Sequence, residues 1–208
     1  HGVTTLANAV VLKTAGIQGV GGGLNPSVTG YQVVIVNPAS ASYFSWSGMP
    51  SSITAGYPFS VTITAKDQYG NTANYIGSAT LTANTGSGTI NPSSTGFFSG
   101  GVTTFLMSAY AVAPTVQVTA WDGGVTGASG VFGVIPGSAN SFVFSAVPSP
   151  VTAGVPFSVT ITAKDQWNNT ATTYGELGET ATLWDTTGTL TPTSATFSSG
   201  TAIFSATI

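Results

Sequence analysis

The stretch TAGYPFSVTITAKDQ at residues 54–68 decides the fold class. Inside it the apolar residues Phe59, Val61, Ile63 and Ala65 alternate with Ser and Thr. An alternation with period two is typical of a β-strand that buries one face and exposes the other. The stretch therefore predicts a strand at the surface of a hydrophobic core.

The same stretch occurs twice. It returns 98 residues later, at 152–166, as TAGVPFSVTITAKDQ, with one difference. Pro38 and Pro136 share that spacing. A fixed period of this length indicates tandem structural modules, and 208 residues suffice for two modules of ordinary domain size.

Shorter echoes extend the repeat toward both ends of the chain. GVTTF at 101–105 resembles GVTTL at 2–6 and GTAIF at 200–204, and VTG at 125–127 matches VTG at 28–30. The chain is therefore expected to begin in the late part of one module and to stop partway through another. The predicted division is 1–38 (donor strands and linker), 39–137 (a complete module) and 138–208 (an incomplete module).

The predicted fold is all-β, with tandem immunoglobulin-like sandwiches of which the C-terminal one is incomplete. Val, Ile, Thr and aromatic residues dominate the apolar runs, while Gly, Pro, Asn and Asp separate them as turn formers. About seven short strands in a module of this length is the pattern of an immunoglobulin-like sandwich. Helical spacing of apolar residues is not sustained anywhere.

The segment AGYPFSVTITAKDQYGNTANYIGSATLT at 55–82, and its second copy, resemble bacterial immunoglobulin-like repeats of surface proteins and invasin-type adhesins. The likeness covers about the first half of each module and includes a K-D-x-x-G-N turn. The second copy departs from it, with Asn168 where the first has Gly70. The resemblance implies a secreted, rigid spacer or adhesive module at the cell surface, and it carries over no catalytic residues.

Composition excludes several function classes. The chain has 3 Lys and Arg and 6 Asp and Glu, and its net charge is −3, so we expect neither nucleic acid nor an anionic membrane as a partner. No apolar run is long enough to span a membrane. Cys is absent and His1 is the single histidine, which leaves no triad and no His-based or thiolate metal site. Glu176 and Glu179 lack a partner acid at the spacing that a glycosidase needs. We therefore predict no enzymatic activity, no metal and no cofactor.

The incomplete module lacks a counterpart of residues 115–135. A sandwich without those strands would expose an apolar groove and unpaired strand edges. The N-terminal segment 3–36 resembles the missing region, and we expect it to insert into a neighbouring molecule. Such a contact is head-to-tail and propagates as an open filament. The logic resembles pilins joined by donor-strand complementation, including archaeal extracellular thread subunits.

A second interpretation stays open, in which the chain is an excerpt of a longer array and flanking repeats supply the missing strands. The protein would then be a cell-surface adhesin or a carbohydrate-binding spacer. Its four tryptophans can stack on surface glycans or lie in cores and interfaces: Trp46, Trp121, Trp167 and Trp184.

The predicted assembly residues lie near the N-terminus. Alternation over residues 3–13 selects a donor strand whose apolar side chains would fill the groove. A further strand is predicted at the junction. The donor residues are Val3, Leu6, Val10 and Leu12, and the junction residues are Tyr31, Val33, Val34, Ile35 and Val36.

One glycosylation site is predicted. Asn168 begins Asn-Asn-Thr, whereas Asn25 and Asn91 are each followed by Pro, which blocks the sequon. Asp67 and Asp165, in the repeated turns, are expected to hydrogen-bond the turn backbone rather than to bind Ca²⁺.

Overall fold

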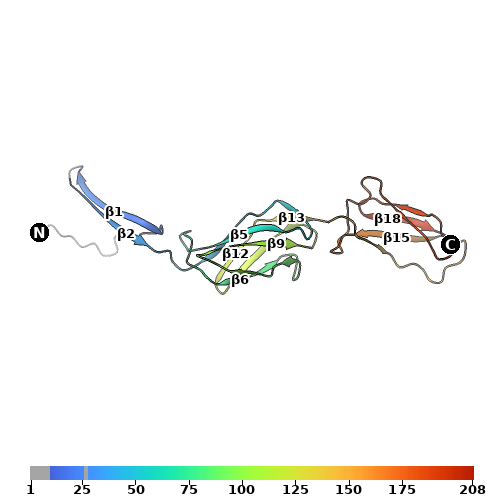
Figure 1. Ribbon diagram of the computed structural model, residues 1–208, viewed down its shortest axis with the longest axis horizontal. Helices are drawn as coiled ribbons and strands as arrows, with labels where there is room; N and C mark the ends of the chain where they lie inside the picture. The colour runs from blue at the N-terminus through green and yellow to red at the C-terminus, as the bar shows by residue number, and fades with distance from the viewer. Residues whose placement is uncertain (1–9, 26–27) are drawn as a thin grey trace.

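The computed structural model describes residues 10–25 and 28–208 and contains β-strands without helices in those ranges. It forms an elongated row of three parts: an N-terminal hairpin, a closed sandwich and a C-terminal sandwich (Figure 1). The all-β immunoglobulin-like prediction is confirmed. Across the described ranges, no helix is long and apolar enough to cross a membrane.

The hairpin pairs β1 (Gly16–Asn25) with β2 (Val28–Val36) in antiparallel register. At one end Gly16 faces Val36, and at the other Asn25 faces Val28. Ile17 and Ile35 face each other and are 76% and 73% exposed. A lone two-stranded hairpin is only marginally stable in water, so β1 and β2 lack the packing partner that such strands normally need.

The closed sandwich lies within residues 39–137. Its strands are β3 (Tyr43–Ser47), β4 (Ser52–Thr54), β5 (Phe59–Lys66), β6 (Ser78–Ala83), β7 (Ile90–Asn91), β8 (Ser94–Phe97), β9 (Val102–Ala109), β10 (Ala113–Val116), β11 (Val118–Asp122), β12 (Val125–Ala128) and β13 (Phe132–Ile135). One sheet has the order β7-β9-β5-β3-β12-β11-β6-β8, and the other has the order β10-β13-β4. The strands enclose one hydrophobic core.

Strand β5 shows why this sequence folds as it does. Val61, Ile63 and Ala65 point into the core and have no exposed surface, while the Thr residues between them are half-buried. The period-two pattern of the sequence is thus the in-and-out alternation of a strand that covers a core. Burying such aliphatic side chains contributes roughly 1.5–3 kcal/mol each for the larger ones.

The C-terminal sandwich lies within residues 138–208 and is open. Its strands are β14 (Ser141–Phe144), β15 (Phe157–Lys164), β16 (Thr180–Thr182), β17 (Ser194–Thr196) and β18 (Thr201–Ala206). They form one sheet of β14-β15-β18 and a separate β16-β17 pair. Within residues 138–208, all of them described, no strand takes the places that β10–β13 hold in the closed sandwich.

Candidate assembly site

The two sandwiches are joined by the side chain of Asn169. Its Nδ2 donates to the Tyr110 carbonyl oxygen at 2.8 Å, and its Oδ1 accepts from the Val112 backbone N–H at 3.2 Å. Tyr110 and Val112 follow β9 of the closed sandwich, whereas Asn169 lies in the turn after β15 of the open one. One amide therefore ties the modules together through the backbone.

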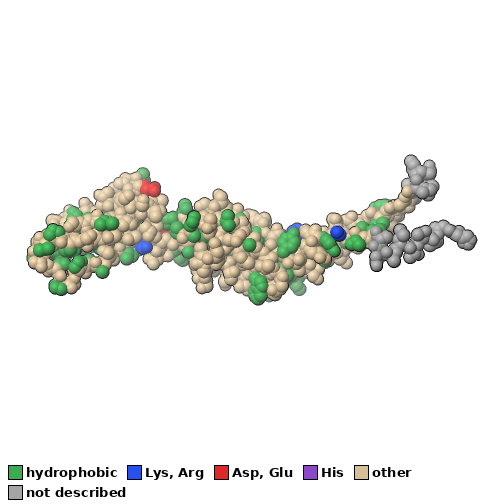
Figure 2. All heavy atoms as spheres, turned by 180° about the vertical axis from the view of Figure 1, so that it is seen from behind, with side chains coloured by type: hydrophobic (Ala, Val, Ile, Leu, Met, Phe, Trp, Pro, Cys, Tyr) green, Lys and Arg blue, Asp and Glu red, His purple; other side chains and the backbone are tan. Residues whose placement is uncertain are grey.

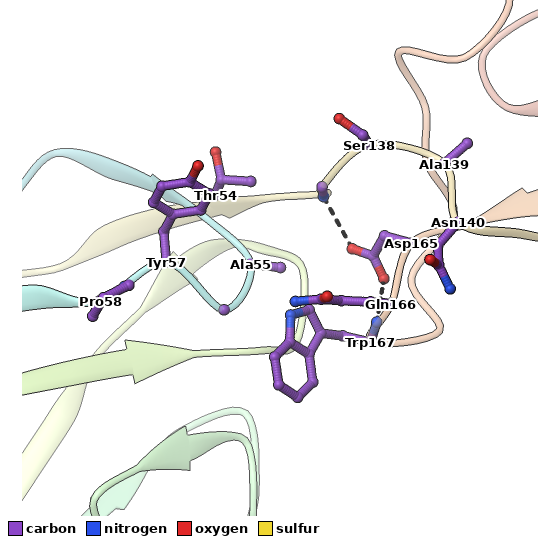
Figure 3. Close-up of a pocket in the computed structure, with 12 residues that line it drawn as sticks. Thr54, Ala55, Tyr57, Pro58, Ser138, Ala139, Asn140, Asp165, Gln166 and Trp167 are labelled. Atoms are coloured by element: carbon purple, nitrogen blue, oxygen red, sulfur yellow. Dashed lines mark hydrogen bonds between the residues drawn. The ribbon is translucent and has the colours of Figure 1, made fainter.

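Asp165 holds Asn169 in place. Its carboxylate is buried and accepts hydrogen bonds from the backbone N–H groups of Gly137 and Trp167, at 3.0 and 2.9 Å (Figure 3). It also accepts from the backbone N–H and the Nδ2 of Asn169, both at 2.9 Å. Burial works to raise the pKa of Asp165, but these hydrogen bonds outweigh it, so the pKa lies below its ordinary value. The carboxylate stays ionised near neutral pH and orders the joint.

Trp167 adds apolar contact to the same joint. Its ring stacks on Tyr110 with centroids 4.1 Å apart, and a Cβ at Gly56 would collide with its indole. Gly56 also has φ +80°, which favours glycine. Figure 3 shows Trp167 facing the Ala55 loop, beside a cavity of about 430 Å³ whose walls come from both modules.

The same joint occurs a second time, between the N-terminal segment and the closed sandwich. Asn71 Nδ2 donates to the Lys13 carbonyl at 2.8 Å, and the Ala15 N–H donates to Asn71 Oδ1 at 2.9 Å. Asp67 accepts from Asn71 and from the Ala39 N–H at 3.0 Å. In place of the Tyr110–Trp167 stack, Lys13 Nζ lies 5.7 Å from the centre of the Tyr69 ring.

The carboxyl group of the N-terminal joint, that of Asp67, has a lowered pKa as well. Burial favours a higher pKa for Asp67, but hydrogen bonds from the Asn71 side chain and from the backbone N–H groups of Ala39, Asn71 and Tyr69 prevail and hold the pKa at about 2. Residues 13–15 are thus held in the way that residues 110–112 are held. The segment that precedes the closed sandwich occupies the place of the end of a preceding module.

The open sandwich carries an apolar groove of about 400 Å³. Apolar side chains from several strands and loops line it, and Figure 2 shows hydrophobic side chains gathered on this end of the molecule. The main ones are Phe144, Val147, Phe157, Val159, Leu183 and Trp184.

The closed sandwich fills the corresponding space with its own strands. The buried residues there are Val116 in β10, Val118 in β11, and Phe132 and Val134 in β13. The ring of Phe132 lies 5.5 Å from that of Phe59, whose counterpart in the open sandwich is Phe157. The groove is therefore the space that four missing strands would occupy.

The predicted assembly residues fall on both sides of the described boundary. Val3 and Leu6 lie outside the described residues. Val10 is 63% exposed and Leu12 is half-buried, and both precede β1. The junction residues lie in β2 and are mostly exposed: Tyr31, Val33, Val34, Ile35 and Val36. Their role in assembly stays a prediction.

Asp67 and Asp165 do hydrogen-bond their turns, as expected, but sequence reasoning missed Asn71 and Asn169. The signal was the repeated Lys-Asp-Gln turn, in which an Asn follows each Asp four residues later. Among the described residues, no three His, Cys, Asp or Glu side chains group as metal ligands. Glu179 accepts hydrogen bonds from the Gly175 and Leu177 N–H groups of its own loop.

The remaining candidates are the glycosylation site and the tryptophans. Asn168 lies in the turn after β15 with φ 66°, and its glycosylation stays a prediction. Trp121 and Trp184 are 55% and 80% exposed, whereas Trp46 is half-buried and donates from Nε1 to the Gly127 carbonyl at 2.9 Å. Trp121 and Trp184 lie on different modules, so these two side chains do not form one platform.

No protein-family model matches the chain, and no curated protein is similar to it in sequence. Among solved structures, domains 4–9 of the surface layer protein SbsC align at 18% identity and TM-score 0.36, over 86% of this chain and 29% of that one. The Escherichia coli adhesin FdeC aligns at 19% identity and TM-score 0.43, over 87% of this chain and 60% of that one. An ICAM-5 D1–D4 ectodomain fragment aligns at 10% identity and TM-score 0.34, over 93% and 53%.

These likenesses are too distant to transfer a function. The chain spans less than two thirds of each of those structures, and their identities lie below one fifth. The fold assignment rests on the strands and cores of this chain.

Proposed function

We propose that the protein is a non-enzymatic structural subunit at the cell surface, which joins head-to-tail into an extracellular filament by strand complementation. One observation carries this proposal. The molecule has an unfilled sandwich at one end and an unpartnered hairpin at the other (Figure 1). Each end lacks what the other offers, and a contact between different ends of two copies propagates instead of closing.

The surface of the chain carries few charges, which limits the forces that can join two copies. Only 4% of its residues are charged, and Figure 2 shows few charged side chains on the face that it displays. Such a surface gives little basis for electrostatic recognition, so apolar burial and backbone pairing are left to drive association.

The proposal is tested by concentrating the purified full chain and following its size by sedimentation velocity and negative-stain electron microscopy. We expect oligomers that lengthen with concentration and thin filaments of linearly joined modules. A stable monomer at millimolar concentration contradicts the filament. The dye ANS should bind the monomer at the groove and lose fluorescence as oligomers form, because assembly buries the apolar lining.

A second candidate is an adhesive or carbohydrate-binding spacer, and the exposure of Trp121 and Trp184 favours it. Aromatic faces that stand in solvent can stack on sugar rings. Binding to a glycan array that is lost in Trp121→Ala or Trp184→Ala would support this function. Filament formation that persists in both variants, without glycan binding, would support the first.

A further inference from the structure

We propose that the β1–β2 hairpin of one copy fills the groove of a second copy, in the place that β10–β13 take in the closed sandwich. This inference rests on the proposed head-to-tail assembly and names its contact. The donor is then the hairpin Gly16–Val36, and the acceptor is the open sandwich 138–208.

The hairpin keeps the strand pairs at both ends of the segment that it would replace. In the closed sandwich Ala113 faces Val134 and Asp122 faces Val125. The hairpin pairs the corresponding residues, Gly16 with Val36 and Asn25 with Val28. The matching pairs lie at both ends of the hairpin, whereas between them the hairpin register differs by one residue from that of β10–β13.

The acceptor presents a free edge for each part of the hairpin. In the closed sandwich β12 pairs with β3, β11 with β6, and β13 with β4. The counterparts of β3 and β6 are β14 and β16, and each pairs with one strand only. The counterpart of β4, residues 150–152, forms no strand at all. Docking would supply the missing neighbour at all three places.

The sequence of residues 2–12 matches a strand that the open sandwich already has. Their GVTTL motif matches GVTTF in β9 and GTAIF at the start of β18. The open sandwich already contains β18. This strand pairs with β15, which contributes Phe157 and Val159 to the lining of the groove. A second copy of that strand would duplicate a part that is present, whereas the hairpin supplies parts that are absent.

Side chains on the hairpin also match the groove. At the 98-residue spacing, Val34 and Val36 correspond to Phe132 and Val134, which are 2% exposed in the closed sandwich. Val34 is 38% exposed in the free hairpin. After docking it would face Phe157, as Phe132 faces Phe59. Glycines in β1 let the strand bend where β10 and β11 pass from one sheet to the other.

One glycine gives a sharp steric test. In β12 a Cβ at Gly127 would collide with the backbone of Phe44, so the strand passes directly over that residue. The hairpin counterpart of Gly127 is Gly30, and the counterpart of Phe44 is Phe142, which is 41% exposed. In the free hairpin the nearest atom to a Cβ at Gly30 is 4.0 Å away. A methyl group at Gly30 is thus harmless in the monomer and blocks docking.

The hairpin and groove lie at opposite ends of the elongated chain, so docking joins two copies (Figure 1). Docking would also bring the closed sandwich of one copy against the open sandwich of the other. Gly154 has φ +74° and open space where Gly56 has Trp167 against it. Tyr69 is the counterpart of Trp167. Docking would place Tyr69 of one copy against Gly154 of the other and rebuild the module joint.

The first experiment compares Gly30→Ala with Gly22→Ala in the full chain. These residues face each other in the hairpin, but the counterpart of Gly22, at the spacing that relates Asn25 to Asp122, is Thr119, where the closed sandwich accommodates a side chain. We expect Gly30→Ala to weaken association in sedimentation roughly ten- to a hundredfold, the effect of overpacking a tight contact. Gly22→Ala should associate like the unmodified chain. Equal association of both variants overturns the inference.

The second experiment locates the contact by disulfide formation in a chain that has no other cysteine. Val134 faces Ile53 in the closed sandwich, so Val36→Cys should pair with Val151→Cys of the next copy. Oxidation of the double variant should give a covalent ladder of oligomers on a denaturing gel. Val33→Cys with Val151→Cys is the control, because Val33 lies on the other face of β2.

The outcomes separate this inference from the proposed function. Monomers at all concentrations refute head-to-tail assembly itself. Assembly that forms no Val36–Val151 disulfide, ignores Gly30→Ala and fails after deletion of residues 1–9 refutes the hairpin as donor and assigns that role to the N-terminal strand. Assembly that survives this deletion, is weakened by Gly30→Ala and yields the disulfide ladder supports the hairpin.

Discussion

The two sandwiches share a strand of identical sequence, FSVTITAK, in β5 and β15, with the same pattern of buried and exposed positions. Their surroundings differ. Phe44, next to β5, is 3% exposed, whereas its counterpart Phe142, next to β15, is 41% exposed. The aromatic cluster around each is nearly the same, with Phe44–Phe98 centroids 5.4 Å apart and Phe142–Phe197 centroids 5.2 Å apart.

The comparison shows which part of the fold is local and which is not. With Tyr75 and Tyr174 as the third rings, this aromatic cluster and the central strand form in both modules, with or without β10–β13. What those four strands add is the cover over Phe44 and the closing of the sheet edges. A module of this kind can therefore keep half of its core while it presents the other half to a partner.

The largest predicted effect is a difference in stability loss between alanine variants of two corresponding residues, Phe44 and Phe142. Phe44→Ala should destabilise the closed sandwich by about 3–5 kcal/mol, since it empties a buried aromatic site. Phe142→Ala should cost the open sandwich about half of that or less, because solvent already reaches the ring. Chemical denaturation followed by circular dichroism measures both. Equal costs in the monomer would show that Phe142 is as well packed as Phe44.

The next prediction compares Gly56→Ala with Gly154→Ala. Both residues have positive φ, +80° and +74°, so both alanines should cost roughly 1–2 kcal/mol of stability in their own module. Gly56→Ala should also push Trp167 off Tyr110 and alter tryptophan fluorescence, whereas Gly154→Ala should leave that fluorescence unchanged. The same fluorescence change in both variants would contradict the packing of Trp167 on Gly56.

A smaller effect is expected for Asn169→Ala, which removes two hydrogen bonds between the modules and touches neither core. The unfolding free energy of the C-terminal module should fall by about 1 kcal/mol. Small-angle X-ray scattering should show a shorter mean end-to-end length, because the modules then bend at the joint. Gln166→Ala, a change at an exposed neighbour, serves as the control. An unchanged scattering curve for Asn169→Ala would refute its role in the joint.

The smallest effect concerns acid. The pKa of Asp67 is about 2 in the folded chain, against 3.8 for an aspartate without these contacts, as in the unfolded chain. Its hydrogen-bonded carboxylate therefore stabilises the N-terminal joint fully above about pH 4. That contribution is lost as the pH falls through 2. Nuclear magnetic resonance should show the Ala15 and Ala39 amide signals shifting over this window and staying fixed in Asp67→Asn. A joint transition above pH 4 would contradict this assignment.

The sequence alone was enough to predict features that depend on alternation within a single strand. Alternation in residues 54–68 located β5, and its second copy located β15, because one buried face is enough to set that pattern. The joint was harder to predict. Asn169 contacts the backbone of residues 110 and 112, more than fifty positions away, and backbone atoms carry no sequence signal.

The hairpin was predicted only in its second half. The run at residues 31–36 is apolar enough to indicate β2, but β1 contains Gly19, Gly21, Gly22 and Gly23, which interrupt any alternation. Glycine in a strand signals a bend or a close approach and lowers strand propensity at the same time. The groove was predicted because residues 115–135 have no counterpart in the C-terminal module. Its lining residues could be named only from the packing of that module.

The two joints are built alike: the Ala39 N–H reaches Asp67 at 3.0 Å, and the Gly137 N–H reaches Asp165 at 3.0 Å. A thread of docked copies would then have an axial period of one module, although each chain spans two. Averaged images would superimpose the joint inside a chain on the joint between chains. The true subunit boundary would become visible only where the paired modules differ in side chain, as at Tyr69 and Trp167.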